Sequence, residues 1–204
     1  MHERKVVFVA PFLAETTLRF VSAVAKLPGV RLALVSQDPV AHVPARLRAR
    51  LSVFERCADA LAAPAILQSV KRAAAQLGGV DRVLGTLEQL QVPLAQVREA
   101  LGVEGVSTAA SEAFRDKSKM KDILRAAGIP CARHCLVEAP ADALAFARDV
   151  GFPMVVKPPA GAGAKATYRV RELGELERLI AKFRPGPERP VLLEEFMIGE
   201  EHSF

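Results

Sequence analysis

The sequence has very few of the side chains that stack on nucleic-acid bases. It contains no tryptophan and a single tyrosine, Tyr168, in 204 residues. Proteins that bind single strands rely on aromatic side chains for stacking. The excess of five positive charges is also spread over both halves of the chain and forms no basic tail. The composition therefore argues against a nucleic-acid partner and fits small anionic ligands better.

Long apolar runs and cysteines are scarce as well. No stretch approaches the roughly 18 apolar residues that a membrane span requires. The first residues contain no small-residue cleavage site, so we expect neither a membrane segment nor a secretory signal. Cys57, Cys131 and Cys135 are an odd number of cysteines, which argues against a disulfide framework and favours a cytoplasmic protein. On a strand, Cys131 and Cys135 would lie about 13 Å apart, too far to share a metal ion.

The first half of the chain alternates short apolar segments with helical ones. The expected strands cover residues 5–10, 31–36, 53–57 and 82–85, and the expected helices cover 16–26, 64–77 and 93–101. Strands that alternate with helices require crossover connections, and these predict an open parallel sheet. The turn after the first strand, residues 11–14, lacks the Gly-x-Gly-x-x-Gly pattern of a dinucleotide loop.

The second half has a different succession of strand and helix patterns, which predicts a mixed α+β arrangement. The expected strands cover residues 132–137, 152–157, 168–171 and 191–195, with a further strand beginning at 201, and the expected helices cover 116–127, 141–150 and 173–183. The first of these helices should be capped by Asp116. Its apolar stripe, expected to be its buried face, consists of Met120, Ile123, Leu124 and Ala127.

The sharpest chemical feature is a lysine followed by a run of small residues. An apolar strand ends at Lys157, and the loop after it contains Gly161, Ala162, Gly163, Ala164 and Lys165. Small residues let backbone N–H groups approach phosphate oxygens, and a lysine adds a point charge. Because a strand follows this loop, the pattern predicts a hairpin flap over phosphates; the alternative is a surface hairpin with a solvated lysine.

Two further clusters point to an anionic, base-containing ligand. Lys117 lies at the start of a helix and borders its apolar stripe, where it could reach a buried anion, but this cluster taken alone favours the alternative of a solvated amphipathic helix. Glu194 and Glu195 face opposite ways on a strand, so they cannot form a metal-chelating pair. One of them could accept a hydrogen bond from a ligand, and the backbone of Phe196 and Met197 beside it suits a purine; the alternative is a solvated strand end.

Together, in this order and spacing, these clusters resemble the ATP-grasp superfamily. The matching segments are residues 102–107, 115–121, 128–130, 151–158 and 194–201, so the resemblance covers roughly residues 80–204. It implies an open parallel-sheet pre-ATP-grasp domain over residues 1–107 and an α+β ATP-grasp lobe over 108–204. A complete grasp has a second lobe with the Mg²⁺ ligands, and we expect this chain to be an N-terminal fragment whose catalytic residues follow Phe204.

The resemblance also implies a nucleotide site. The matching positions are Lys117, Lys157, Gly161, Ala162, Gly163, Ala164, Lys165, Glu194, Glu195, Phe196, Met197 and Glu201. In the family the two lysines contact the ATP phosphates and the segment 161–165 closes over them. Glu194 matches the position that binds the adenine amino group, the backbone of Glu195 and Met197 lines the base, and Glu201 matches the ribose ligand. The alanines within the loop depart from the most glycine-rich members.

The activity implied by the resemblance is an ADP-forming carboxylate–amine ligase that works through an acyl phosphate. ATP and Mg²⁺ are the expected cofactors, with no metal ligand in these residues, and the partners are small carboxylates and amines. A homodimer is compatible with the family. Two alternatives stay open: a carboxylase or carbamoyl-phosphate-type enzyme that activates bicarbonate, and a nucleotide-binding module without catalysis.

Overall fold

The structure is a computed structural model that describes residues 3–160, 166–200 and 202. The chain divides into two compact units, Met1–Glu112 and Ala113–Phe204, and each is considered by itself. The domain boundary between residues 107 and 108 remains a prediction; the helix α5 (Thr108–Arg115) begins there and runs through the division between the two units. No helix in the described ranges is long and apolar enough to cross a membrane.

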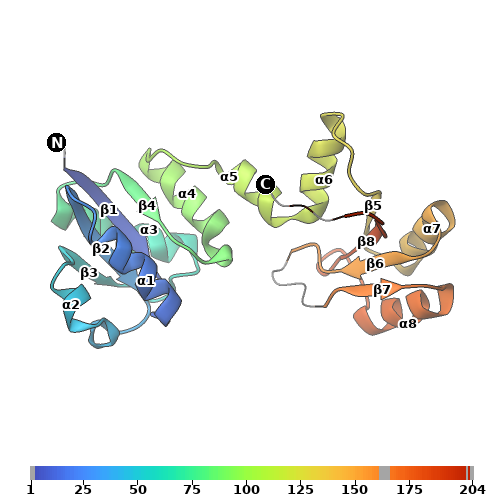
Figure 1. Cartoon of the computed structure of the whole chain (residues 1–204), viewed down its shortest axis with the longest axis horizontal. Coiled ribbons are helices and arrows are strands. Elements are labelled where there is room, and N and C mark those ends of the chain that lie inside the picture. The colour runs from blue at the N-terminus through green and yellow to red at the C-terminus, as the bar shows by residue number, and fades with distance from the viewer. Residues whose placement is uncertain (1–2, 161–165, 201, 203–204) are drawn as a thin grey trace. The chain divides into compact units, whose positions relative to one another are not determined.

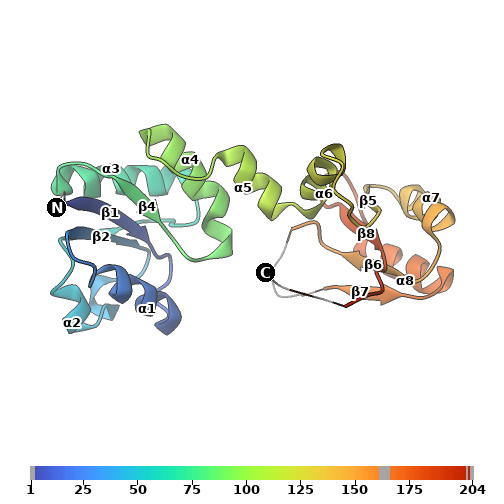
Figure 2. The same cartoon turned by 45° about the horizontal axis from the view of Figure 1, so that its top comes forward.

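The first unit is an open sheet of four parallel strands in the order β3-β2-β1-β4, which confirms the predicted parallel sheet. Its elements are β1 (Arg4–Val9), α1 (Glu15–Val24), β2 (Val30–Ser36), the 3-10 helix η1 (Val40–His42), α2 (Ala45–Arg48), β3 (Val53–Arg56), α3 (Ala63–Leu77), β4 (Arg82–Leu84), the 3-10 helix η2 (Glu88–Leu90) and α4 (Gln91–Leu101). Figure 2 shows α3 and α4 on one face of this sheet and α1 and α2 on the other. Both faces are therefore covered, which explains why β1 and β2 read as continuous apolar runs.

The second unit is built on an antiparallel sheet in the order β5-β8-β6-β7, and it confirms the predicted α+β class (Figure 1). Its elements, after α5, are α6 (Lys117–Ala126), β5 (His134–Val137), α7 (Pro140–Val150), β6 (Met154–Lys157), β7 (Tyr168–Val170), α8 (Leu173–Phe183) and β8 (Val191–Glu195). The helices α7 and α8 pack on one face of the sheet and form its core with Met154, Val156 and Leu193. Because strand side chains alternate, the opposite face carries Val155, Lys157, Leu192 and Glu194.

The helix α6 differs from the prediction in the face that it buries. Asp116 caps it as expected, since its carboxylate accepts hydrogen bonds from the backbone N–H groups of Ser118 and Lys119 at 2.9 and 3.1 Å. The predicted apolar stripe, however, is wrong as a buried face: Ile123 is 57% exposed, whereas Lys121 turns toward the sheet. The reason is the partner that α6 meets, a sheet face that carries charged side chains rather than an apolar core.

Candidate nucleotide site

The candidate site lies on the face of the second sheet opposite α7 and α8. The strand register aligns four side chains in one row across the sheet, namely Arg169 on β7, Val155 on β6, Glu194 on β8 and His134 on β5. The neighbouring row on the same face contains Lys157 and Leu192. Apolar and charged groups therefore alternate on this face, with Val155 and Leu192 between the ionisable side chains.

Glu194 and Lys157 form the closest ion pair of the site. The two residues lie diagonally on adjacent strands, a spacing that long side chains can bridge. Lys157 Nζ donates a hydrogen bond to Glu194 Oε2 at 2.6 Å. The carboxylate side chain is only 9% exposed and the lysine 19%. A pair this poorly solvated is held much more tightly than an exposed one, because water screens it little.

A second lysine approaches the other oxygen of the same carboxylate. Lys121 Nζ, on α6, lies 3.6 Å from Glu194 Oε1, and its side chain is 12% exposed. At that distance the contact is an ion pair without hydrogen-bond geometry. Within the described part of the chain, Glu194 Oε1 is buried and has no hydrogen-bond partner. Glu194 therefore presents one satisfied oxygen and one oxygen that can still accept a hydrogen bond.

Glu195 has a different role from Glu194, as the alternation of strand side chains predicts. Its carboxylate accepts hydrogen bonds from Arg133 Nε at 2.8 Å and from the Arg133 backbone N–H at 2.9 Å. These hydrogen bonds with Arg133 hold the pKa of the Glu195 carboxyl below its usual range. The backbone N–H of Glu195 also donates to the Arg133 carbonyl oxygen. The side chain of Glu195 thus ties β8 to the residues before β5 and does not face the candidate site.

The first predicted lysine lies where α6 begins. The backbone N–H of Lys117 donates to the carbonyl oxygen of Pro159 at 3.0 Å. This bond joins the start of α6 to the segment that follows β6, so Lys117 and the strand end at Lys157 belong to the same edge of the unit. A helix N-terminus at that edge also favours anions.

The residues after β8 carry the remaining described part of the site. The guanidinium carbon of Arg169 lies 3.9 Å from the centre of the Phe196 ring, a cation–π contact that covers this end of the row. The backbone N–H of Phe196 donates to the Pro153 carbonyl oxygen at 3.3 Å, so this donor, expected from the sequence to face a base, is already used within the fold. Met197 is 65% exposed.

His134, on β5, is the last residue of the row across the sheet that also contains Glu194. Its side chain is 4% exposed and lies between two residues of α6, with Nε2 3.2 Å from Asp122 and Nδ1 3.3 Å from Arg125. Burial lowers the pKa of this imidazole below its ordinary value, an effect that the nearby Asp122 carboxylate only partly offsets. Three described side chains that can carry a positive charge face Glu194, namely Lys121, Lys157 and His134. The sequence predicted a role only for Lys157. The signal for Lys121 was its position one helical turn after Lys117.

Several predicted positions lie outside the described residues, namely Gly161, Ala162, Gly163, Ala164, Lys165 and Glu201. Among the residues that the structure does describe, no three His, Cys, Asp or Glu side chains converge as a metal site. No magnesium ligand is therefore assigned among the described residues. The described cysteines are free thiols, and burial raises the pKa of Cys135.

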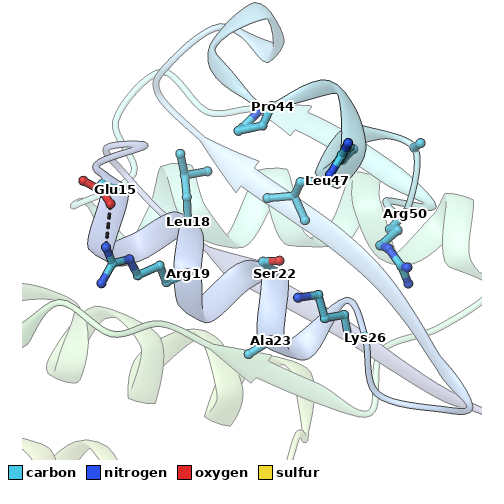
Figure 3. A pocket seen from close by; sticks show the side chains of 11 residues that line it. Glu15, Leu18, Arg19, Ser22, Ala23, Lys26, Pro44, Leu47 and Arg50 are labelled. Carbon is cyan, nitrogen blue, oxygen red and sulfur yellow. Dashed lines mark hydrogen bonds and ion pairs between the residues drawn. The ribbon is translucent and has the colours of Figure 1, made fainter.

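The first unit contains a large hollow of about 1060 Å³ between α1 and α2 (Figure 3). Leu18 and Leu47 face it from the two helices, and Lys26 and Arg50 stand at its rim. Its charged side chains are all exposed, and Arg19 is paired with Glu15 at 2.6 Å. Exposed cations around an apolar floor bind a specific ligand poorly, because water already solvates them. The buried carboxylate of the second unit is the stronger candidate.

Comparison with known proteins matches part of the chain to a known ATP-binding domain. Residues 116–203, which contain α6 and the whole second sheet, match the family model described as the ATP binding domain of the carbamoyl-phosphate synthase L chain. The matched part of the chain is thus similar to an ATP-binding domain, in line with the resemblance to the ATP-grasp superfamily. The matched region begins at the cap of α6 and includes Lys117, Lys121, Lys157 and Glu194.

Curated ATP-grasp relatives resemble part of the chain. The carbamoyl phosphate synthase large chain of Thermus thermophilus is 34% identical over 125 residues, which are 59% of this chain and 12% of that protein. The D-alanine–D-alanine ligase of an Azoarcus species is 31% identical over 128 residues, which are 61% of this chain and 38% of that protein. The chain thus spans well under half the length of these relatives.

Solved ATP-grasp structures share the fold over nearly the whole chain. The L-amino acid ligase of Bacillus licheniformis matches with a TM-score of 0.68 and 20% identity, covering 97% of this chain and 45% of that one. The biotin carboxylase domain of the Hydrogenobacter thermophilus 2-oxoglutarate carboxylase, solved with MgADP, ADP and bicarbonate, matches with a TM-score of 0.73 and 19% identity, covering 97% and 45%. This chain therefore spans about half the length of the solved structures.

Proposed function

We propose that this chain supplies the ATP-binding face of an ADP-forming carboxylate–amine ligase. The observation that supports the proposal best is the buried carboxylate of Glu194, which has one oxygen on Lys157 and the other without a hydrogen bond. A buried acceptor left unsatisfied costs about 1–3 kcal/mol or more. An exocyclic amino group of a bound base would satisfy it, and Val155 and Leu192 beside it offer apolar contact to the ring.

The phosphates would lie toward the edge where Lys157 and Lys117 are located. Lys157 ends β6 and Lys117 begins α6, and the hydrogen bond between Lys117 and Pro159 holds these two segments together. Two ammonium groups there would neutralise part of the triphosphate charge, which phosphoryl transfer requires. The segment 161–165 and Glu201 complete the proposed site as the phosphate flap and the ribose ligand, and the backbone of Met197 lines the base.

The proposed reaction has two steps. An oxygen of the substrate carboxylate attacks the γ-phosphorus of ATP, the bond to the β,γ-bridging oxygen breaks, and ADP leaves. The nitrogen of the amine then attacks the acyl carbon, phosphate leaves, and the amine proton passes to solvent or to a base. Magnesium would neutralise the transferred phosphate; its ligands and the catalytic residues are not assigned within this chain. The free thiols and the lack of a described membrane helix fit a cytoplasmic enzyme.

The alternative activity is the activation of bicarbonate, as in a carbamoyl-phosphate-type enzyme or a carboxylase. The match of residues 116–203 to the carbamoyl-phosphate synthase model favours this alternative. Both activities begin with the attack of a carboxylate or bicarbonate oxygen on the γ-phosphorus. The proposed ATP face is therefore the same for both, and only the acceptor differs.

The proposal is tested by nucleotide affinity. Lys157→Ala removes a charge-assisted phosphate contact worth about 1.5–3 kcal/mol, so the dissociation constant for MgATP should rise about 10- to 100-fold. Lys119→Ala, on the exposed side of α6, is the matched control and should change it less than threefold. Equal effects of the two substitutions would remove the basis for this site. ADP formation with a pool of carboxylates, amines and bicarbonate then distinguishes ligase, bicarbonate-activating enzyme and binding module.

A further inference from the structure

In the proposed site Lys157 has two possible partners, the Glu194 carboxylate and a nucleotide phosphate. Without nucleotide its ammonium lies 2.6 Å from Glu194 Oε2. With nucleotide it would turn toward a phosphate, which carries more charge than a carboxylate. The hydrogen bond to Glu194 would then lengthen or break. The carboxylate is 9% exposed, so water cannot replace the lost ammonium at low cost.

Lys121 is positioned to stabilise the buried Glu194 carboxylate when Lys157 turns away. Its ammonium approaches Glu194 from the other side, 3.6 Å from Oε1, and it is carried by α6, which the Asp116 cap and the Pro159 contact hold in place. The side chain is 12% exposed, an unusual environment for a lysine unless it serves a buried anion. A small movement would bring the two groups from ion-pair distance to hydrogen-bond distance.

We propose that Lys121 is a positioning residue that keeps Glu194 charged and aligned when Lys157 turns to the nucleotide phosphates. In this arrangement Glu194 retains a cation in both states and remains an acceptor for the amino group of the base. Lys157 can then exchange its partner without leaving a buried carboxylate unpaired. This inference rests on the proposed function, because it concerns the state in which nucleotide is bound.

The other ionisable groups that face Glu194 cannot take this role. The described neighbours are Lys121 from α6, Lys157 from β6 and His134 from β5. Burial lowers the pKa of His134, so its imidazole is neutral at pH 7. It is also already in contact with Asp122 and Arg125. Lys121 is therefore the cation among these neighbours that remains beside Glu194 once Lys157 has turned away.

Proton uptake on nucleotide binding distinguishes this role from a structural one. Calorimetric titration of the chain with ATP at pH 7, in two buffers of different ionisation enthalpy, measures the protons taken up per nucleotide. In Lys121→Met a buried carboxylate left without a cation favours its protonated form. The variant should therefore take up more protons per nucleotide than the wild-type chain, and its affinity should fall about tenfold and weaken further between pH 6 and pH 8.

The controls separate the possible outcomes. Lys121→Arg should restore the wild-type proton count, and Lys119→Met should leave it unchanged. The fluorescence of Tyr168, the only tyrosine in a chain without tryptophan, reports whether each variant is folded, and Lys121→Gln replaces Lys121→Met if the latter unfolds. A variant that is less stable but binds ATP with the wild-type proton count would overturn the role of Lys121 alone. A folded wild-type chain that gives no binding heat and no ATP-induced fluorescence change would overturn the proposed function, and this inference with it.

Discussion

The pairing of Lys157 with Glu194 can be measured as a coupling energy without any nucleotide. The perturbation is a double-mutant cycle that combines Lys157→Met, which keeps the length of the side chain, with Glu194→Gln, which keeps its shape. The assay is urea unfolding followed by Tyr168 fluorescence. Since Tyr168 lies in β7 and no tryptophan interferes, this signal reports the second unit alone.

The burial of the two side chains sets the expected magnitude. Removing one partner of a fully buried pair costs about 3–5 kcal/mol. Glu194 is 9% exposed, but Lys157 is 19% exposed and Lys121 remains 3.6 Å away. We therefore expect Lys157→Met to lower the free energy of unfolding by about 2 kcal/mol and Glu194→Gln by about 1 kcal/mol. The double variant should lose less than the sum, which gives a coupling energy of about 1.5 kcal/mol.

The same unit contains a matched control pair. Arg133 and Glu195 lie at a similar distance, 2.8 Å, but the arginine is half exposed. Their coupling energy should be below about 1 kcal/mol, as for other solvated pairs. If the coupling of Lys157 and Glu194 were no larger than that of Arg133 and Glu195, the argument that burial makes Glu194 dependent on its lysines would be refuted.

Two further predictions concern the elements around the site. Asp116→Ala removes the N-cap of α6 and should lower the stability of the second unit by about 1 kcal/mol, with Asp116→Asn or Asp116→Ser close to wild type; an unchanged urea midpoint in Asp116→Ala would contradict the cap. His134 has a lowered pKa in the folded state, so the unfolded chain binds its proton more readily and stability should fall as the pH drops below about 6.5. His134→Gln should remove this part of the pH dependence, seen in Tyr168 thermal melts at pH 7.5 and 5.5; an equal loss of melting temperature in both proteins would contradict it.

The sequence predicted most strands and helices because their signals are local. The apolar runs that form β1 and β2, and the alternation that separates Glu194 from Glu195, both follow from side-chain periodicity. The helix α5 went unpredicted because it is only eight residues long, shorter than the windows of about 11 to 18 residues over which helical periodicity is counted. The buried face of α6 was predicted wrongly for a different reason. Periodicity identifies which face of a helix is apolar, but not which side chains of the neighbouring sheet that helix packs against. Here α6 contacts Glu194 and His134.

The assembly of the site could not be predicted from local signals. Lys157 and Glu194 are 37 residues apart, and their contact depends on the register between β6 and β8. Helical spacing places Lys121 one turn after Lys117 and on a different side of α6 from Lys119, but only the tertiary position of α6 brings Lys121 to Glu194. The resemblance to the ATP-grasp superfamily indicated which positions to consider, but not that Glu194 would have two lysines.

The most direct test of the central claim is a crystal structure of this chain with a non-hydrolysable ATP analogue. The account predicts the base against Val155 and Leu192, its amino group within hydrogen-bond distance of Glu194 Oε1, and Lys157 Nζ turned from Glu194 to a phosphate oxygen. Nucleotide bound elsewhere, for example in the hollow between α1 and α2, or bound here with the 2.6 Å contact between Lys157 and Glu194 unchanged, would contradict it.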